Sequence, residues 1–379
     1  MSRTLEILGQ LVAFPTVTRD SNLELIDWVQ TFLTSAGFDV MRIWSPDRNK
    51  AGLFAQIGPK VEGGICLSAH TDVVPTEGQT WTRPPFKLTD EGDRVYGRGT
   101  TDMKGFLASA LALAERIAKT QLSAPLSLSI SYDEEIGCVG IQQMMPELKQ
   151  VIGRPRVVIV GEPTSMQVAI GHKGKTALNV ICHGQEGHSA LAPNFVNAVH
   201  LAADFIQQMR GLQAKLAEGP FDESYNVPYS TVHIGKIFGG QALNIVPSDA
   251  QIAMEFRHLA QAPAQDILQS IENIARQISE GYSSVSAINV DIVNTYPGLD
   301  VDPSNSVVEW IGKMAGTTQT TKVPFGTEAG FFSNLGLDAI VIGPGDMASD
   351  GHKPDEGLSK DELVACDKMM ENLATALKI

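Results

Sequence analysis

The chain has 379 residues and a formal net charge of −14 at neutral pH. This length favours two domains over a single core, because single cores rarely extend beyond about 300 residues. The acidic balance argues against nucleic acids and anionic membranes as partners, since both are bound through basic surfaces. No apolar run is long enough to cross a bilayer.

The four cysteines are far apart in the sequence and form no CxxC motif, so a zinc finger is not expected. Two of them lie in apolar runs, which predicts buried free thiols. The first residues also lack the apolar segment of a signal peptide. These features predict a cytoplasmic protein.

The first half of the chain alternates helical and strand patterns. Apolar runs predict strands at 53–57, 65–69, 126–131 and 157–160, and the last run is apolar throughout. Helices are predicted at 23–36, which ends before Gly37, and at 103–118, which reads as amphipathic. Strands separated by helices indicate an α/β domain with helices on both faces of a sheet.

The order of elements changes near Lys173. Strands are predicted at 176–183, 230–237, 250–256 and 287–293, with helices at 194–209 and 264–279. This β-α-β-β-α-β order is that of a ferredoxin-like unit. The α/β pattern then resumes, with helices at 305–315 and 328–334, a strand at 339–342 and a helix from Ser359.

These patterns predict a larger three-layer α/β/α domain formed by residues 1–174 and 294–379. A ferredoxin-like α+β domain of residues 175–293 is inserted into it. Insertion at a surface loop is tolerated where the two ends of the insert lie close together.

Side chains of the kind that bind metals follow several of the predicted strands or lie in a glycine-rich loop. In open α/β sheets, binding sites form beyond the carboxyl ends of the strands. We therefore expect these side chains to meet at one edge of the larger domain. They are His70 and Asp72, Asp102, Asp133-Glu134-Glu135, Glu162 and His352.

Each of these residues also has an ordinary structural explanation when it is considered alone. Asp102 is placed to cap the helix predicted to begin at Met103, and Glu162-Pro163 can be a plain loop. A single histidine is more often a surface or core residue than a ligand. The metal hypothesis depends on the repetition of such residues at one edge.

The residue types indicate which metals are expected. Imidazole and carboxylate without thiolate favour zinc, or cobalt or manganese, over copper or iron–sulfur clusters. Two histidines and three carboxylates suit two divalent ions about 3.5–4 Å apart that share one carboxylate. Asp72 lies on the same strand face as His70 and is placed to accept its second imidazole N–H. A turn acid is an equally good interpretation of Asp72.

Three acids in a row, Asp133-Glu134-Glu135, end the strand at 126–131. In an ideal strand Glu134 and Glu135 would face opposite sides. Both reach one site only if the strand ends and the chain turns, which Gly137 makes plausible. We expect no catalytic role for Asp133 and assign it a backbone-capping role.

Six motifs together resemble the family of acetylornithine deacetylases, succinyl-diaminopimelate desuccinylases and aminoacylases, which are two-metal hydrolases. The motifs occur in family order in both predicted domains. They are SAHTDVVP (68–75), YGRGTTDMKGF (96–106), DEEIG (133–137), GEPT (161–164), GHSA (187–190) and GDMASDGHKPDE (345–356).

The resemblance implies a role for each matching residue. It implies that His70, Asp102 and Glu162 bind one metal ion. It implies that Asp102, Glu135 and His352 bind the other, so that Asp102 bridges the two. Glu134 is then the general base, and Asp72 orients His70.

The resemblance also implies that the inserted domain is a lid and the surface of a homodimer. This domain is expected to supply His188, often across the dimer interface, with Asn244 in its polar loop and Arg257 for the substrate carboxylate. His188 can equally be a loop histidine, and Arg257 a solvated cation at a strand end. Gly239 and Gly240 can be turn glycines without a ligand role.

The loop Gly326-Thr327-Glu328-Ala329 resembles the acetylornithine deacetylase version of this segment. Glu328 would then pair with the δ-ammonium group of ornithine, although it can equally cap the helix at 328–334. The expected reaction is hydrolysis of N-acetyl-L-ornithine to acetate and L-ornithine in arginine biosynthesis. The alternatives are N-acetylcitrulline, N-succinyl-diaminopimelate or a similar N-acyl amino acid, or a non-catalytic metal-binding homologue. The presence of Glu134 disfavours the last.

Overall fold

The computed structural model describes residues 2–282 and 286–379. The chain forms two compact units. The first runs as far as Gly171 and includes Leu299–Val323 and Thr327–Ile379. The second consists of His172–Gly298 and Pro324–Gly326. The predicted 175–293 domain contains residues 283–285, which lie outside the described residues, and its function as a lid or dimer surface stays a prediction.

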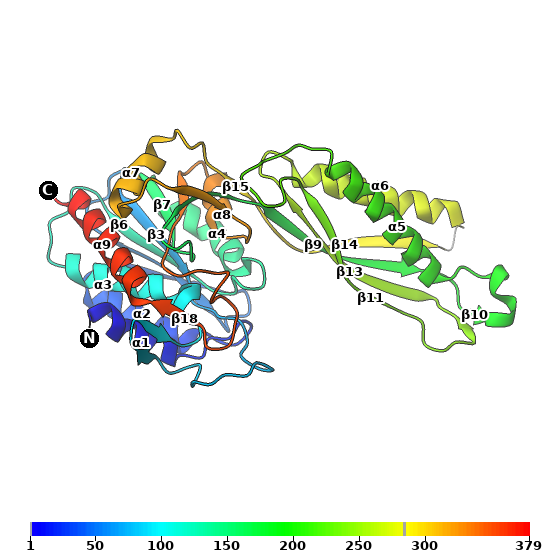
Figure 1. Cartoon of the computed structure of the whole chain (residues 1–379), viewed down its shortest axis with the longest axis horizontal. Helices are drawn as coiled ribbons and strands as arrows, with labels where there is room; N and C mark the ends of the chain where they lie inside the picture. The colour runs from blue at the N-terminus through cyan, green and yellow to red at the C-terminus, as the bar shows by residue number, and fades with distance from the viewer. Residues whose placement is uncertain (1, 283–285) are drawn as a thin grey trace. The chain divides into compact units, whose positions relative to one another are not determined.

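The first unit is built on a nine-stranded mixed sheet (Figure 1). Its central strands β6, β3, β7 and β17 are parallel neighbours in that order, whereas β2 joins β6 antiparallel. The sheet order is β1 (Asp39–Trp44), β2 (Ala51–Ile57), β6 (Leu126–Ser131), β3 (Ile65–His70), β7 (Val157–Val160), β17 (Ala339–Val341), β8 (Val168–His172) and β15 (Leu299–Asp300), with β16 (Thr320–Val323) paired to β8.

Helices cover both faces of this sheet, so the central strands are buried along their whole length. One face carries α1 (Arg3–Ala13), α2 (Leu23–Ser35), α3 (Gly105–Ile117), α7 (Ser306–Ala315) and α9 (Lys360–Leu377), which share one apolar cluster with the strands. The other face carries α4 (Val139–Val151), which packs against β1, β2 and β6, and α8 (Ala329–Asn334), which packs against β7 and β17. The predicted three-layer α/β/α architecture is confirmed.

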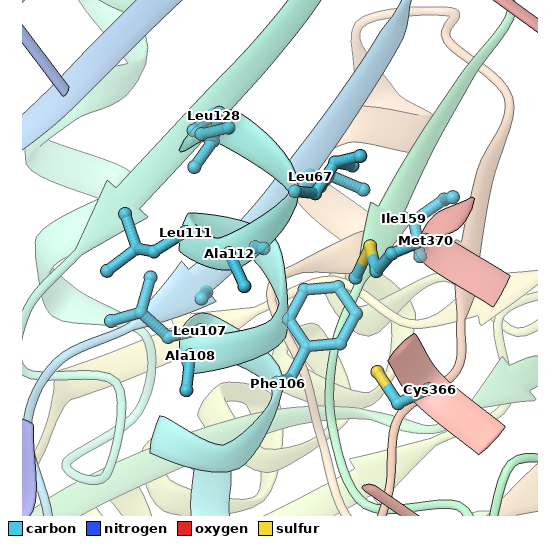
Figure 2. Packing of buried hydrophobic residues seen from close by; sticks show 14 of the residues in the cluster. Leu67, Phe106, Leu107, Ala108, Leu111, Ala112, Leu128, Ile159, Cys366 and Met370 are labelled. Atoms are coloured by element: carbon cyan, nitrogen blue, oxygen red, sulfur yellow. The ribbon is translucent and has the colours of Figure 1, made fainter. Parts of the chain in front are cut away.

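Helix α3 is the centre of the apolar cluster. Every residue from Gly105 to Ala114 is buried, because α1 and α9 pack against α3 in addition to the sheet. In Figure 2, Phe106 points toward Ile159 of β7 and toward Cys366 and Met370 of α9. The prediction of an amphipathic helix from Met103 is therefore wrong on two points: the helix begins at Gly105 and has no solvent-facing stripe along these ten residues.

A short three-stranded sheet lies beside the larger one, formed by β4 (Thr89–Glu91), β5 (Arg94–Tyr96) and β18 (Gly357–Ser359). A π-helical turn, η1 (Thr100–Lys104), precedes α3. Asp102, within this turn, has the non-helical angles φ −118° and ψ 94°. The backbone at Asp102 thus leaves the helical path before α3 begins.

The second unit contains a four-stranded antiparallel sheet in the order β11-β13-β9-β14. Its elements are β9 (Gly174–His183), α5 (Ala198–Leu216), β11 (Thr231–Gly239), β13 (Asp249–His258), α6 (Ala264–Tyr282) and β14 (Ala287–Tyr296), with η2 (Ser189–Asn194) and a two-stranded sheet of β10 (Gly187–His188) and β12 (Ile245–Val246). Burial alternates strictly along β9, and its buried side chains pack with those of α5 and α6. This is the predicted ferredoxin-like order.

All four cysteines are buried and free, as predicted for those in apolar runs. A search of the described residues finds no helix with the length and apolar character needed to span a bilayer.

Candidate two-metal centre

The order of the parallel strands brings the candidate ligands to one edge of the sheet. His70 is the last residue of β3, Glu135 follows β6, and Glu162 follows β7. The fourth strand, β17, leads into the loop that carries His352. Because these strands are neighbours and point the same way, their carboxyl ends are adjacent. Asp102 reaches the same place from η1.

Two groups of ligand atoms form at this edge. The metal-binding atoms of His70, Asp102 and Glu162 all lie within 4.8 Å of one another, and so do those of Asp102, Glu135 and His352. The two oxygens of Asp102 face different groups. Oδ1 is 3.0 Å from Nε2 of His70, and Oδ2 is 3.1 Å from Nε2 of His352. Asp102 is therefore the shared member.

His352 and Asp102 each contact two side chains of the kinds that bind metal ions. Nε2 of His352 lies 3.0 Å from Oε2 of Glu135 as well as 3.1 Å from Asp102, so one nitrogen faces two carboxylates. A single N–H would have to be shared by both carboxylates in a three-centre hydrogen bond, whereas a cation would be bound by the nitrogen and both carboxylates at once. The helix-cap interpretation of Asp102 is wrong, because the helix begins three residues later and the side chain faces two histidines.

The charges of the buried carboxyl groups fit bound cations. Within the described residues, Oε1 of Glu135 and Oε1 of Glu162 are buried without a hydrogen-bond partner. Burial and the nearby charge of Asp102 together raise the pKa of Glu135 to about 7. Burial and the charge of Asp102 also hold the pKa of Glu162 well above its usual value. Divalent cations would satisfy both oxygens and offset this repulsion.

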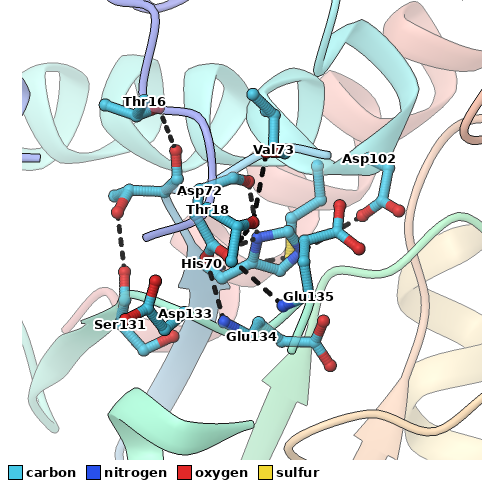
Figure 3. A network of polar contacts seen from close by, with 12 residues as sticks. Thr16, Thr18, His70, Asp72, Val73, Asp102, Ser131, Asp133, Glu134 and Glu135 are labelled. Atoms are coloured by element: carbon cyan, nitrogen blue, oxygen red, sulfur yellow. Dashed lines mark hydrogen bonds and ion pairs between the residues drawn. The ribbon is translucent and has the colours of Figure 1, made fainter. Parts of the chain in front are cut away.

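Asp72 contacts both His70 and the backbone segment that carries Glu134 and Glu135 (Figure 3). Nδ1 of His70 lies 3.0 Å from the backbone oxygen of Asp72 and 3.4 Å from its Oδ1. The carboxylate accepts the N–H of Glu134 at 3.0 Å, the N–H of Glu135 at 3.2 Å and the hydroxyl of Thr18 at 2.9 Å. Burial alone would raise the pKa of Asp72, but these bonds and that to His70 hold it below the usual value. Asp72 therefore contacts the Glu134-Glu135 backbone as well as His70.

Glu134 belongs to neither ligand group. Its Oε1 accepts a hydrogen bond from the thiol of Cys138 at 3.1 Å, a contact that the sequence did not suggest. Burial raises the pKa of Glu134 to about 8, and the charges of Glu135 and Asp102 add to the rise although His70 opposes it. A carboxyl group with a pKa near neutrality is suited to accept and return a proton.

Asp133 faces away from the ligand groups. Its φ of +51° lies in the left-handed region, where aspartate is tolerated. Oδ1 accepts the N–H of Arg19 at 3.1 Å and is 2.5 Å from Nζ of the buried Lys50. Asp133 bonds a backbone N–H as expected, but that N–H belongs to Arg19, which is 114 positions away in the chain. Asp133 also forms a buried ion pair with Lys50.

Glu328 is buried next to the same strand ends. Glu328 is the N-cap residue of α8, as the helix-cap alternative predicted, but its side chain makes no capping hydrogen bond. Oε1 accepts from the hydroxyl of Ser131 at 2.5 Å and Oε2 from that of Ser68 at 3.3 Å. Burial raises the pKa of Glu328 to about 7, although both serines oppose the rise.

The other three predicted residues belong to the second unit. His188 and Asn244 are exposed neighbours, because β10 pairs with β12 and the N–H of Ser189 donates to the backbone oxygen of Asn244 at 3.0 Å. Nδ1 of His188 accepts the N–H of Ala190 at 3.1 Å. Nε of Arg257, near the end of β13, donates to Oε1 of Glu255 at 3.0 Å.

Paired ligand groups that share one aspartate, with a free glutamate beside them, define a two-metal hydrolase site. A family model described as peptidase family M20/M25/M40 matches residues 66–376. The chain is similar to the acetylornithine deacetylase of Myxococcus xanthus, with 33% identity over 368 residues that cover 96% of this chain and 94% of the relative. The chain therefore belongs to the M20/M25/M40 peptidase family, and it is a metal-dependent hydrolase of linear amides.

Two solved structures show the same fold. A metallo-carboxypeptidase of the M20 family from Sulfolobus solfataricus matches with a TM-score of 0.79 at 20% identity, over 99% of each chain. A dinuclear metal-binding peptidase of the M20 family from Bacillus subtilis matches with a TM-score of 0.71 at 15% identity, over 99% of this chain and 98% of the other.

Proposed function

We propose that this chain hydrolyses N-acetyl-L-ornithine to acetate and L-ornithine, a step of arginine biosynthesis. The observation that carries the hydrolytic part is the cluster of two ligand groups with the free carboxyl group of Glu134 beside it. The substrate rests on the relatives: acetylornithine deacetylases match at 33–34% identity over more than 90% of both lengths.

We assign His70, Asp102 and Glu162 to one metal position and Asp102, Glu135 and His352 to the other. The unpartnered oxygens of Glu135 and Glu162 support this assignment. Bound divalent ions, for which we propose zinc with cobalt as a substitute, would polarise the amide carbonyl and lower the pKa of water. Every assigned ligand is carboxylate or imidazole, as those ions accept.

Glu134 is assigned as the general base. Its carboxylate takes the proton of the attacking water and returns it to the leaving amine. Asp72 holds the backbone N–H groups of Glu134 and Glu135, and this fixes the base relative to the ligands. We assign His188 to the oxyanion that develops on the substrate, and Asn244 and Arg257 to binding the substrate, with Arg257 on its carboxylate.

Glu328 is proposed to select the cationic side chain of ornithine. Its carboxyl group is 1% exposed and is held by two serines, so its effect comes from the negative charge that it places behind the site in its ionised form. E328Q keeps the shape and removes that charge. We expect kcat/KM to fall for acetylornithine but not for a neutral N-acetyl amino acid. Equal kcat/KM for both substrates in the wild-type enzyme would contradict this role.

We further propose that the enzyme is a cytoplasmic homodimer that associates through the second unit. The alternative substrates, N-acetylcitrulline and N-succinyl-diaminopimelate, differ from acetylornithine in side-chain charge or in acyl group. A panel of N-acyl amino acids assayed on metal-reconstituted enzyme separates them. We expect the highest kcat/KM for N-acetyl-L-ornithine. A clear preference for a succinyl group or for a neutral side chain would overturn the substrate, and hydrolysis of none would overturn the function.

A further inference from the structure

One buried carboxylate behind the centre holds the backbone around Asp102. Glu356 is 1% exposed and uses both of its oxygens. Oε1 accepts the N–H of Thr101 at 2.9 Å and the N–H of Asp102 at 3.0 Å. Oε2 accepts the N–H of Gly99 at 2.9 Å and is bonded to the guanidinium of Arg98 at 2.8 Å. A single side chain therefore holds three backbone N–H groups of the segment 99–102.

Arg98 extends this contact to the loop of His352. Its guanidinium is also buried, lies 5.0 Å from the ring centroid of Trp81, and donates to Oε1 of Gln79 at 2.5 Å and to the backbone oxygen of Lys353 at 3.3 Å. Nε2 of Gln79 donates to the backbone oxygen of His352 at 2.8 Å. A continuous chain of hydrogen bonds thus joins the backbone of His352 to that of Asp102 through the Glu356–Arg98 pair.

Both ligand groups include Asp102, whose backbone this pair holds, but only the second group also includes His352, which the pair reaches as well. His70 ends a buried strand and Glu162 comes two residues after another, so the sheet itself fixes two of the three ligands of the first group. Asp102 and His352 come from segments outside the sheet, and these are two of the three ligands of the second group. Partners behind the ligands are what hold a metal ligand in place when regular structure does not.

We propose that Glu356, with Arg98, is the positioning residue of the Asp102–Glu135–His352 metal position. Its loss weakens ion binding there and largely spares the His70–Asp102–Glu162 position. The proposal rests on the ligand assignment of the proposed function and not on the identity of the substrate.

E356Q tests the proposal with the smallest change of shape. The carboxylate of Glu356 accepts hydrogen bonds from four donors, two at each oxygen. The glutamine amide has only one acceptor oxygen, so its NH2 group would face two of these donors and could not bond to them. Titration with Co²⁺, followed by visible absorption, reports how many ions bind and with what coordination. We expect two ions per wild-type chain. In E356Q we expect one ion bound as in the wild type and the other weakened by about 10- to 100-fold.

D355N is the matched control. Asp355 lies in the same loop and accepts hydrogen bonds from the N–H groups of Thr82 and Arg83 at 3.0 and 3.1 Å, but it does not contact the segment around Asp102. We expect D355N to bind both ions as the wild type does. If E356Q does not fold, R98K provides the second variant, because lysine keeps the charge but loses the fork that joins Glu356, Gln79 and Lys353.

The outcomes separate this proposal from the proposed function. E356Q with two ions of wild-type affinity overturns the positioning role. Parallel weakening of both ions, with a lower Tm of the metal-free chain, also overturns it and indicates a general structural role. A wild-type chain that binds fewer than two ions overturns the ligand assignment itself. If the wild-type chain does not hydrolyse acetylornithine but both chains bind ions as expected, only the proposed substrate is overturned.

Discussion

Asp133, Glu134 and Glu135 are consecutive in the chain, yet each side chain has different neighbours. Glu135 faces His352, Glu134 faces the thiol of Cys138, and Asp133 faces Lys50. The residue types at the strand ends were sufficient to predict that histidine and carboxylate side chains gather at one sheet edge, whereas their assignment as metal ligands stays a prediction. Lys50 was not predictable, because a lone lysine 83 positions away has no pattern that marks its partner.

The Lys50–Asp133 pair gives a prediction about stability. K50M leaves the carboxylate of Asp133 buried without its cation, so we expect the free energy of unfolding to fall by about 3 kcal/mol. K313M is the matched control, because the Lys313–Glu309 pair is exposed to solvent and is expected to contribute little to stability. Denaturant unfolding of both variants and of K50M/D133N measures these effects. A K50M chain as stable as K313M would contradict the account.

At the scale of elements, the apolar runs at 65–69, 126–131 and 157–160 located the parallel strands because strands buried on both faces consist almost wholly of apolar and small residues. Helix α3 was misread because a periodic pattern does not show that α1 and α9 cover the second face. The backbone conformation of Asp102 was equally unpredictable. Nothing in the residue types indicates that the chain forms η1 there and turns the side chain away from a capping position.

Gly140, the second residue of α4, gives a prediction at this scale. A Cβ atom there would lie 1.8 Å from the carbonyl oxygen of Tyr132, which immediately precedes the acidic segment. G140A is therefore expected to lower both Tm and metal affinity, although Gly→Ala within a helix usually stabilises by about 1 kcal/mol. G211A in α5 is the control, because no atom lies within 4 Å of its Cβ position. Thermal unfolding that shows G140A to be at least as stable as G211A would contradict this contact.

At the scale of the whole molecule, sequence order showed that an α/β pattern is interrupted by a ferredoxin-like one and then resumes. It did not show that Pro324–Gly326 associates with the second unit, because three residues carry no periodicity. Within the described residues, every member of the two ligand groups belongs to the first unit. The stability supplied by bound ions is therefore expected to reside in that unit.

Metal removal tests this expectation. Ions that bind only the folded state stabilise it by mass action, and without them the buried carboxylates repel one another. We expect chelation to increase hydrogen exchange in peptides that cover β3, β6 and β7. Peptides that cover β9 and β13 should exchange as before. Equal loss of protection in both sets would show that the ions stabilise the two units together.

The central claim is that Glu134 moves the proton while its neighbour Glu135 holds an ion. The most direct test measures kcat and bound metal together in E134A, E135Q and the wild type. We predict that E134A keeps two ions and loses at least about 100-fold in kcat, whereas E135Q binds its ion more weakly. Hydrolysis by E134A at the wild-type rate and equal metal content would contradict the account.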